Sequence, residues 1–198
     1  MFGFEDTEFQ WNRGHWKCLQ KKNGKLRGFK YKQCAKKFLE KNNMSKNYAT
    51  DFLTTKAIQF MKRQQQNNET FALVLSIPDP HSPNQVRPPY DTMYDDLSFR
   101  IPETAKMAVR KKPSIPKWSY VHENYRNVPP SVSSQKIEEV EKSRWYQNQQ
   151  KKIFGMVKLI DDNVGRILRF LEETGLEKDT IVIFTSDHGD LMHEREYF

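Results

Sequence analysis

The segment "DTIVIFTSDHGDLMH", residues 179 to 193, indicates the fold class more clearly than any other part of the sequence. It contains a short apolar run, Thr180 to Thr185, rich in β-branched side chains and typical of a buried strand. The run leads directly into Ser-Asp-His-Gly, so polar side chains follow the predicted strand. Because ligands of parallel α/β sheets bind at the carboxyl ends of strands, Asp187 and His188 are the first candidate site residues.

The elements around this strand predict an α/β fold. From about Ser143 to Thr174 apolar residues recur at spacings of three and four, which is typical of an amphipathic helix, and Gly175 is a natural helix stop. A second apolar run, Phe71 to Ser76, follows a shorter helical pattern for which Thr50 or Asp51 is the candidate N-cap. Two strands joined through a helix favour a mostly parallel sheet flanked by helices.

All ten prolines lie between Pro78 and Pro130. This stretch is too long and too rich in proline for a simple connection, so we expect a loop excursion that serves as a lid or binding loop. Disorder is the alternative interpretation.

His81 is the second candidate site residue. It lies between Pro80 and Pro83 in "SIPDPHSP", directly after the first predicted strand, where an imidazole can donate to an anion or protonate a leaving oxygen. Both predicted strands end at one edge of the sheet, so His81 is expected near Asp187 and His188. An ordinary loop histidine and a surface Asp-His pair remain the alternatives.

The charge and composition of the chain limit the kinds of binding partner that it can have. The net charge of +8 comes from the first third of the chain, because residues 1–66 hold 15 Lys/Arg against 5 Asp/Glu. Such a segment is either a solvated lysine-rich face or a binding surface for an anionic partner, and nucleic acid is a minor hypothesis. No apolar run approaches the roughly 18 to 20 residues that cross a bilayer. Cys18 and Cys34 form either one disulfide or two free thiols.

Four blocks together resemble the sulfatase family of the alkaline-phosphatase-like superfamily: "YATDFLTTKAIQF", "FALVLSIPDPHSP", "GMVKLIDDNVGRILRFLEETGL" and "TIVIFTSDHGD". They occur in the family's order. The resemblance implies part of an alkaline-phosphatase-like sandwich, and one incomplete catalytic domain over residues 1–198. Its expected parts are a basic segment (1–47), a helix and strand (48–77), the proline-rich loop region (78–142), and a helix, strand and metal-binding loop (143–198).

The resemblance also implies an enzyme that hydrolyses sulfate esters with a divalent cation, usually calcium, and a formylglycine nucleophile. By position, Asp187 matches a metal-binding aspartate, and His188 matches a neighbour that reaches the metal or the sulfate. His81 matches the histidine that contacts the sulfate and the ester oxygen. The implied substrate is a sulfated small molecule or polysaccharide, and the family is mostly exported or lysosomal.

The sequence departs from the family at the nucleophile. Neither Cys18 nor Cys34 begins the Cys/Ser-x-Pro/Ala-x-Arg motif that yields formylglycine, and the family's early Asp-Asp ligands are absent. "GHWK", residues 14–17, has the letters of a family motif in another order, so no role is assigned to its lysine. We expect an internal piece of a longer sulfatase, inactive alone, whose nucleophile lies upstream.

Two other interpretations stay open. A phosphodiesterase or phosphonate hydrolase of the same superfamily is one, because His188 suits zinc or manganese as well as calcium. The other is a non-catalytic basic module that binds sulfated polysaccharide or nucleic acid through residues 13–46, with affinity that falls steeply with salt.

Overall fold

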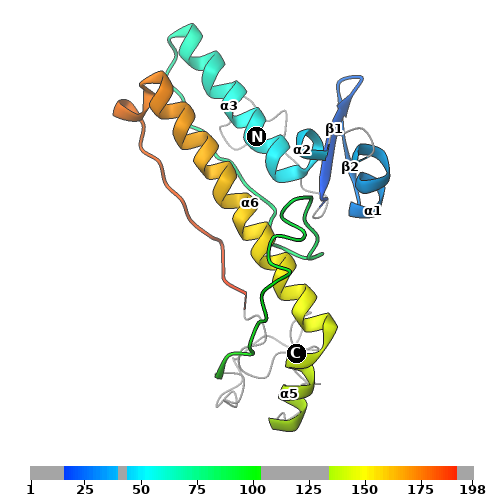
Figure 1. Cartoon of the computed structure of the whole chain (residues 1–198). Coiled ribbons are helices and arrows are strands. Elements are labelled where there is room, and N and C mark those ends of the chain that lie inside the picture. The colour runs from blue at the N-terminus through cyan, green and yellow to red at the C-terminus, as the bar shows by residue number, and fades with distance from the viewer. Residues whose placement is uncertain (1–15, 40–43, 104–133, 191–198) are drawn as a thin grey trace, which may run out of the picture. The chain divides into compact units, whose positions relative to one another are not determined.

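The structure is a computed structural model that describes residues 16–39, 44–103 and 134–190 (Figure 1). Predictions for the first 15 residues and for most of the proline-rich loop lie outside these ranges. The chain divides into two compact units, which we describe separately. The first unit is Met1–Asp96 with Lys151–Ile181, and the second is Leu97–Gln150 with Val182–Phe198. The single catalytic domain inferred above stays a prediction.

The first unit begins with an antiparallel hairpin that the sequence analysis did not predict. Strand β1 (Cys18–Lys22) pairs with β2 (Lys25–Phe29), from Cys18 opposite Phe29 to Lys22 opposite Lys25. Both turn residues have positive φ, 50° at Asn23 and 74° at Gly24. Asn-Gly is the preferred sequence for this type of two-residue turn, so the hairpin had a readable local signal.

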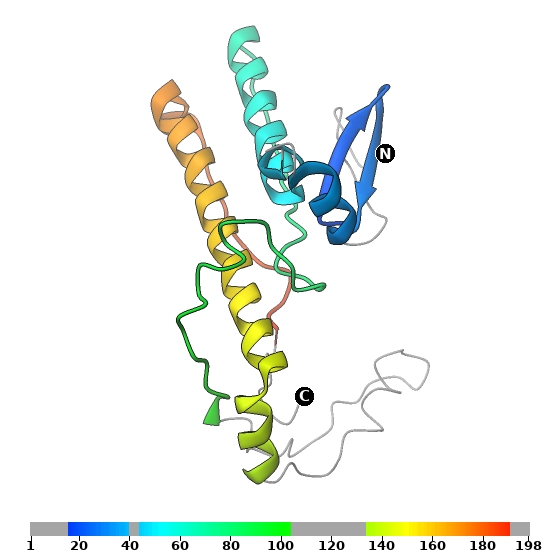
Figure 2. The same cartoon turned by 45° about the vertical axis from the view of Figure 1, so that its right-hand side comes forward.

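Short helical segments connect the hairpin to the first long helix. They are α1 (Tyr31–Cys34), the π-helical turn η1 (Ala35–Leu39) and α2 (Met44–Asn47). Figure 2 shows the hairpin and α1 near the beginning of helix α3 (Ala49–Asn67).

Helix α3 confirms the shorter helical pattern but not its predicted N-cap. The N-cap is Tyr48, which has an extended backbone and no side-chain cap hydrogen bond. Thr50 and Asp51 are instead buried in the first turn, where their side chains bind other segments. The helix ends at Asn68, whose left-handed conformation (φ 57°) is a common helix stop.

The predicted long helix is confirmed as α6 (Arg144–Thr174), which follows α5 (Ser134–Lys142). Gly175 ends it as expected, with φ 73° and its N–H donating to the Glu172 carbonyl at 3.0 Å. The short 3-10 helix η3 (Leu176–Asp179) comes next. No helix among the described residues is both long and apolar enough to cross a membrane.

Each unit has its own apolar core. The main core of the first unit is built from β1, α1, the N-cap of α3, the loop after Pro78 and α6: Cys18, Cys34, Tyr48, Val86, Met156 and Leu159. A smaller cluster of the second unit contains Ile101, Ile137 and Tyr146.

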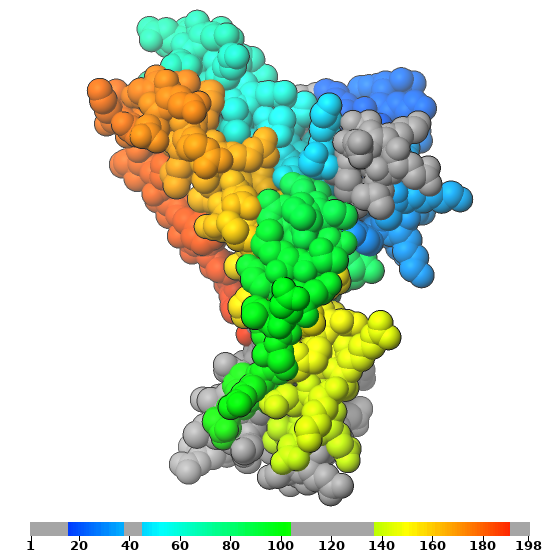
Figure 3. Space-filling view, viewed as in Figure 1, coloured from blue at the N-terminus to red at the C-terminus, as the bar shows by residue number. Residues whose placement is uncertain are grey.

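Helix α6 approaches the loop that follows Pro78 very closely. A Cβ atom added to Gly155 would lie 2.3 Å from the Tyr90 carbonyl oxygen. Figure 3 shows this loop, in green, packed on the yellow part of α6. A glycine is therefore required at the point of contact.

The two apolar runs predicted as buried strands are not strands in this structure. Residues 71–76 and 180–185 have no assigned strand, and several of their side chains are exposed, including Ile181 (90%) and Ile183 (83%). A strand is completed by hydrogen bonds to a neighbour, and β1–β2 is the sheet found among the described residues. The prediction that residues 71–76 and 180–185 are buried strands is therefore wrong for this structure. Helices and a small sheet are both present, whereas the parallel sheet and the sandwich stay predictions.

Candidate functional site

His81 lies on an exposed turn of the first unit. Its N–H donates to the Pro78 carbonyl at 3.2 Å, which closes the turn. Its ring Nδ1 lies 2.8 Å from the carbonyl oxygen of Ser82. This contact places the proton of a neutral ring on Nδ1 and fixes the direction of the imidazole.

A buried ion pair lies directly beneath this turn. Lys17 Nζ donates to Asp79 Oδ1 at 2.6 Å, and the two side chains are only 3% and 1% exposed. The same ammonium donates to the His81 carbonyl at 3.0 Å and lies 3.4 Å from Met156 Sδ. Thr50 Oγ1 donates to the other Asp79 oxygen at 2.6 Å. Burial of two charges is tolerated when their remaining hydrogen-bonding capacity is satisfied in this way.

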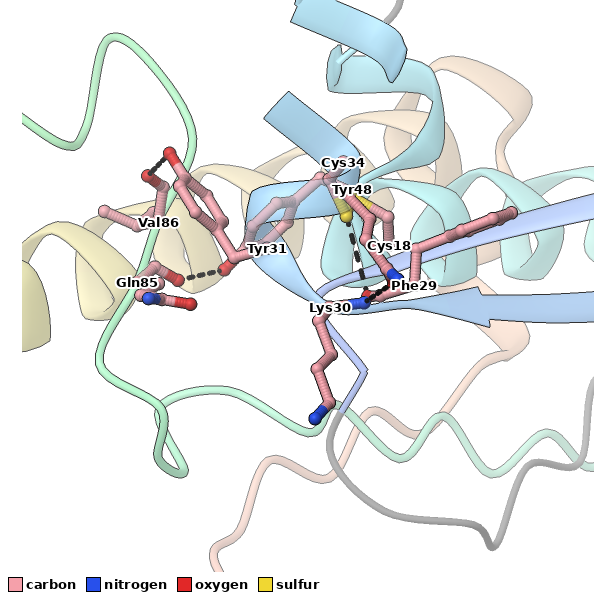
Figure 4. Close-up of a disulfide and its surroundings, with 9 residues drawn as sticks. Cys18, Phe29, Lys30, Tyr31, Cys34, Tyr48, Gln85 and Val86 are labelled. Atoms are coloured by element: carbon pink, nitrogen blue, oxygen red, sulfur yellow. Dashed lines mark hydrogen bonds between the residues drawn. A yellow bond between two sulfur atoms is a disulfide. The ribbon is translucent and has the colours of Figure 1, made fainter. Parts of the chain in front are cut away.

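Two tyrosines hold the following residues of the loop. Tyr48 donates its hydroxyl to the Gln85 carbonyl at 2.9 Å, and Tyr31 donates to the Val86 carbonyl at 2.7 Å (Figure 4). Burial, followed by the charge of Asp91, raises the pKa of Tyr31 to about 12. Burial and then the Asp79 carboxylate raise the pKa of Tyr48 far above its ordinary value of 10.0. Both hydroxyls therefore stay protonated donors throughout the physiological pH range.

A disulfide lies in the same core. Cys18 and Cys34 are bonded, with Cα atoms 6.0 Å apart, so the first of the two alternatives for these cysteines is the one found (Figure 4). The bond connects the start of β1 to the end of α1, next to Lys17 and Tyr31. Disulfides persist in oxidising compartments.

A second buried network holds the far end of this loop. Arg87 donates twice to Asp51, through Nε at 2.6 Å and Nη2 at 2.8 Å. Asn163 of α6 donates to the same carboxylate at 3.1 Å. We name residues 78–90 the His81 loop; the Asp51 carboxylate of α3 thus binds both this loop and α6.

Asp187 and His188 belong to the second unit and lie on an exposed turn, residues 186–190, which we name the Asp-His turn. Their side chains are 87% and 74% exposed, and His188 Nε2 lies 3.6 Å from Asp187 Oδ2. The His188 N–H donates to Asp187 Oδ1 at 2.9 Å, and its Nδ1 is 2.8 Å from the Gly189 carbonyl oxygen. That carbonyl, and then the charge of Asp187, raise the pKa of His188.

These two side chains do not complete a cation site by themselves. A calcium ion takes 6 to 8 oxygen ligands, and structural zinc takes about four. The described ranges contain no group of three or more His, Cys, Asp or Glu side chains that could hold a metal. Chain adjacency brings Asp187 and His188 together, whereas their predicted proximity to His81 stays a prediction.

Sequence reasoning missed the support beneath His81. Lys17 and Asp79 are 62 residues apart, and no local pattern marks them as partners. The available signals were weak: a lysine at the end of "GHWK" and an aspartate two residues before His81.

The chain is similar in sequence to known sulfatases. The family described as Sulfatase matches residues 5–198. An N-acetylglucosamine-6-O-sulfatase of Bacteroides thetaiotaomicron is 26% identical, over 80% of this chain and 36% of the relative. A choline-sulfatase of Rhizobium meliloti is 24% identical, over 78% of this chain and 28% of the relative.

A third relative is the multifunctional alkaline phosphatase superfamily protein PehA of Trinickia caryophylli. It is 28% identical, over 71% of this chain and 27% of its own length. The chain thus matches 27% to 36% of the length of these three relatives.

Proposed function

Because the chain belongs to the sulfatase family, we propose that it carries part of the active site of an enzyme that hydrolyses sulfate esters. The supporting observation is the exposed imidazole of His81 on a backbone bonded to the buried Lys17. In its protonated form this imidazole donates to a sulfate oxygen or to the ester oxygen. Either contact stabilises the negative charge that develops as the S–O bond breaks.

We further propose that Asp187 and His188 are two ligands of a divalent cation, calcium by family resemblance. They supply one carboxylate oxygen and one imidazole nitrogen, so the cation needs further ligands to complete its coordination. When bound, the cation would offset negative charge on the sulfate. His188 is also a candidate contact to the sulfate itself.

We expect the chain of residues 1–198 alone to turn over no sulfate ester. Its sequence contains no Cys/Ser-x-Pro/Ala-x-Arg motif, so the formylglycine nucleophile would come from additional sequence. The proposed substrate is a sulfated small molecule or a sulfated polysaccharide. The relatives include an N-acetylglucosamine-6-O-sulfatase and a choline-sulfatase, whose names support a sulfated sugar or another sulfated small molecule.

The test begins with the coding sequence around residues 1–198, read for an in-frame nucleophile motif. The full product is then assayed with 4-nitrophenyl sulfate, beside its His81→Asn variant and the 198-residue chain. We expect hydrolysis by the full product, loss of about 100-fold or more in kcat/KM on removal of the histidine, and no turnover by the short chain. Full activity of the His81→Asn variant would contradict the assignment.

Phosphoester hydrolysis is the second candidate, favoured by the similarity to the multifunctional relative. The same preparations are assayed with bis(4-nitrophenyl) phosphate. A higher kcat/KM for this diester than for the sulfate ester would replace the first proposal by the second.

A further inference from the structure

Lys17 is buried and has no part in the proposed chemistry. Its ammonium group has three hydrogens, and three acceptors lie around it: a carboxylate oxygen of Asp79, the carbonyl oxygen of His81 and the sulfur of Met156. Asp79 balances the charge of the lysine. The bond to His81 does something more, because it holds the backbone of a candidate site residue.

Lys17 is itself held firmly at its backbone. Its carbonyl oxygen accepts the N–H of Ala49 at 2.9 Å, in the first turn of α3. The next residue, Cys18, is the start of β1 and forms the disulfide with Cys34. The ammonium therefore extends toward the His81 loop from a fixed base.

Further bonds to the His81 loop come from the same part of the chain as Lys17. Thr50 holds the Asp79 carboxylate, and Tyr48 and Tyr31 hold the carbonyls of residues 85 and 86. Among these donors, Lys17 is the one bonded to His81 itself. Its loss should therefore affect the imidazole more than loss of either tyrosine.

We propose that Lys17 is a positioning residue for His81. By bonding the His81 carbonyl and the Asp79 carboxylate together, it fixes the backbone from which the imidazole reaches a sulfate group. The Ser82 carbonyl then sets the orientation of the ring. The inference rests on the proposed function, because it assumes that His81 contacts sulfate.

The test separates positioning from stability with a double variant of the 198-residue chain, Lys17→Met with Asp79→Asn. This change removes both buried charges together, which avoids the large cost of leaving one charge unpaired. The His81 carbonyl nevertheless loses its lysine donor. Leu171→Ala, a cavity variant of a buried residue further along α6, is the control for a general loss of stability.

Two NMR measurements are made on each chain. The first is amide hydrogen exchange at His81, whose N–H bonds Pro78, compared with Phe52 in α3, whose N–H bonds Tyr48. The second is a titration with sodium sulfate that follows the ring signals of His81, assigned with the His81→Asn variant. In the double variant we expect exchange at His81 to rise about tenfold relative to Phe52, and the Kd for sulfate to rise by a similar factor.

The outcomes distinguish the two proposals. Wild-type exchange and wild-type sulfate affinity in the double variant would overturn the role of Lys17, as would an equal change in Leu171→Ala. Ring signals of wild-type His81 that do not respond to sulfate would overturn the proposed function, while the exchange rates would still judge whether Lys17 holds the turn.

If the double variant does not fold, Lys17→Arg provides the second test. A guanidinium keeps a positive charge for Asp79 but, as a planar fork, cannot reproduce three bonds directed like those of an ammonium. We expect a weaker sulfate affinity and faster exchange at His81. Wild-type values for both would contradict the proposal.

Discussion

The His81 loop and the Asp-His turn present histidines to solvent in opposite ways. The His81 loop is bonded by the buried side chains of Lys17, which precedes β1, and of Thr50 and Asp51 in the first turn of α3. The Asp-His turn instead has hydrogen bonds between close neighbours, within residues 186–190. The backbone of His81 is thus bonded by a distant part of the chain, whereas the bonds described at His188 come from its immediate neighbours. Two exposed histidines can therefore differ greatly in how their backbone is supported.

The same substitution, Asp→Asn, at Asp79 and at Asp187 tests the difference in support between the two segments most directly. Asp79→Asn leaves the Lys17 ammonium buried without its counter-charge, and we expect a loss of about 3 to 5 kcal/mol in the free energy of unfolding. Asp187→Asn, at an exposed carboxylate, should change it by less than about 0.5 kcal/mol. Urea unfolding followed by circular dichroism measures both. Similar losses for the two variants would show that the Asp79 site is not the stronger support.

Removal of the disulfide should produce the next largest effect. Cys18 and Cys34 are 16 residues apart, and a loop of that size corresponds to about 3 kcal/mol of stabilisation. The double Cys→Ala variant is compared with the oxidised chain by urea unfolding. NMR signals of the His81 loop should shift and those of the Asp-His turn should not. Equal shifts in both segments would contradict the difference in support.

Two glycines of α6 offer a matched pair. Gly155→Ala places a methyl group against the Tyr90 carbonyl, and we expect a loss of about 1 to 3 kcal/mol. The methyl group of Gly165→Ala would lie 3.6 Å from Arg169 Nη1, an ordinary van der Waals distance. This second change should stabilise the helix by about 0.5 to 1 kcal/mol. Thermal unfolding of both variants checks the opposite signs, and a gain at Gly155 would show that the helix does not press on the loop.

Tyr31→Phe tests whether bonds elsewhere in the His81 loop also position the His81 imidazole. The change leaves the Val86 carbonyl without its hydroxyl donor, and we expect a loss of about 1 kcal/mol. Sulfate affinity should remain close to that of the wild-type chain, because the Tyr31 hydroxyl donates to Val86, further along the loop from His81. A sulfate Kd raised as much as in the Lys17 double variant would assign positioning to the whole loop rather than to Lys17.

The features predicted correctly from the sequence are those encoded locally. The spacing of apolar residues was sufficient for α6, and Gly175 marked its end, because both signals act within a few residues. The N-cap of α3 was predicted wrongly for the opposite reason. Asp51 is used by Arg87, a partner far along the chain, rather than by its own helix.

The two apolar runs, residues 71–76 and 180–185, show a different limit of prediction from sequence. Residues 180–185 have the composition of a strand, but a strand also needs neighbours that supply hydrogen bonds. In the candidate site, too, some residues could be predicted from the sequence and others could not. His81, Asp187 and His188 were found from their positions after these runs, whereas Lys17 could be recognised only after the chain had folded.

The long separations around Lys17 also have a consequence for the order of folding. Its partners Asp79 and Met156 follow it by 62 and 139 residues. Contacts so distant along a chain form slowly, because a large loop must close before they contribute. At about 5 to 20 residues per second, a ribosome needs roughly 7 to 28 seconds to add the residues from Lys17 to Met156. Only at the end of that interval are all three acceptors of the Lys17 ammonium present, so the support beneath His81 is completed after most of the first unit has been synthesised.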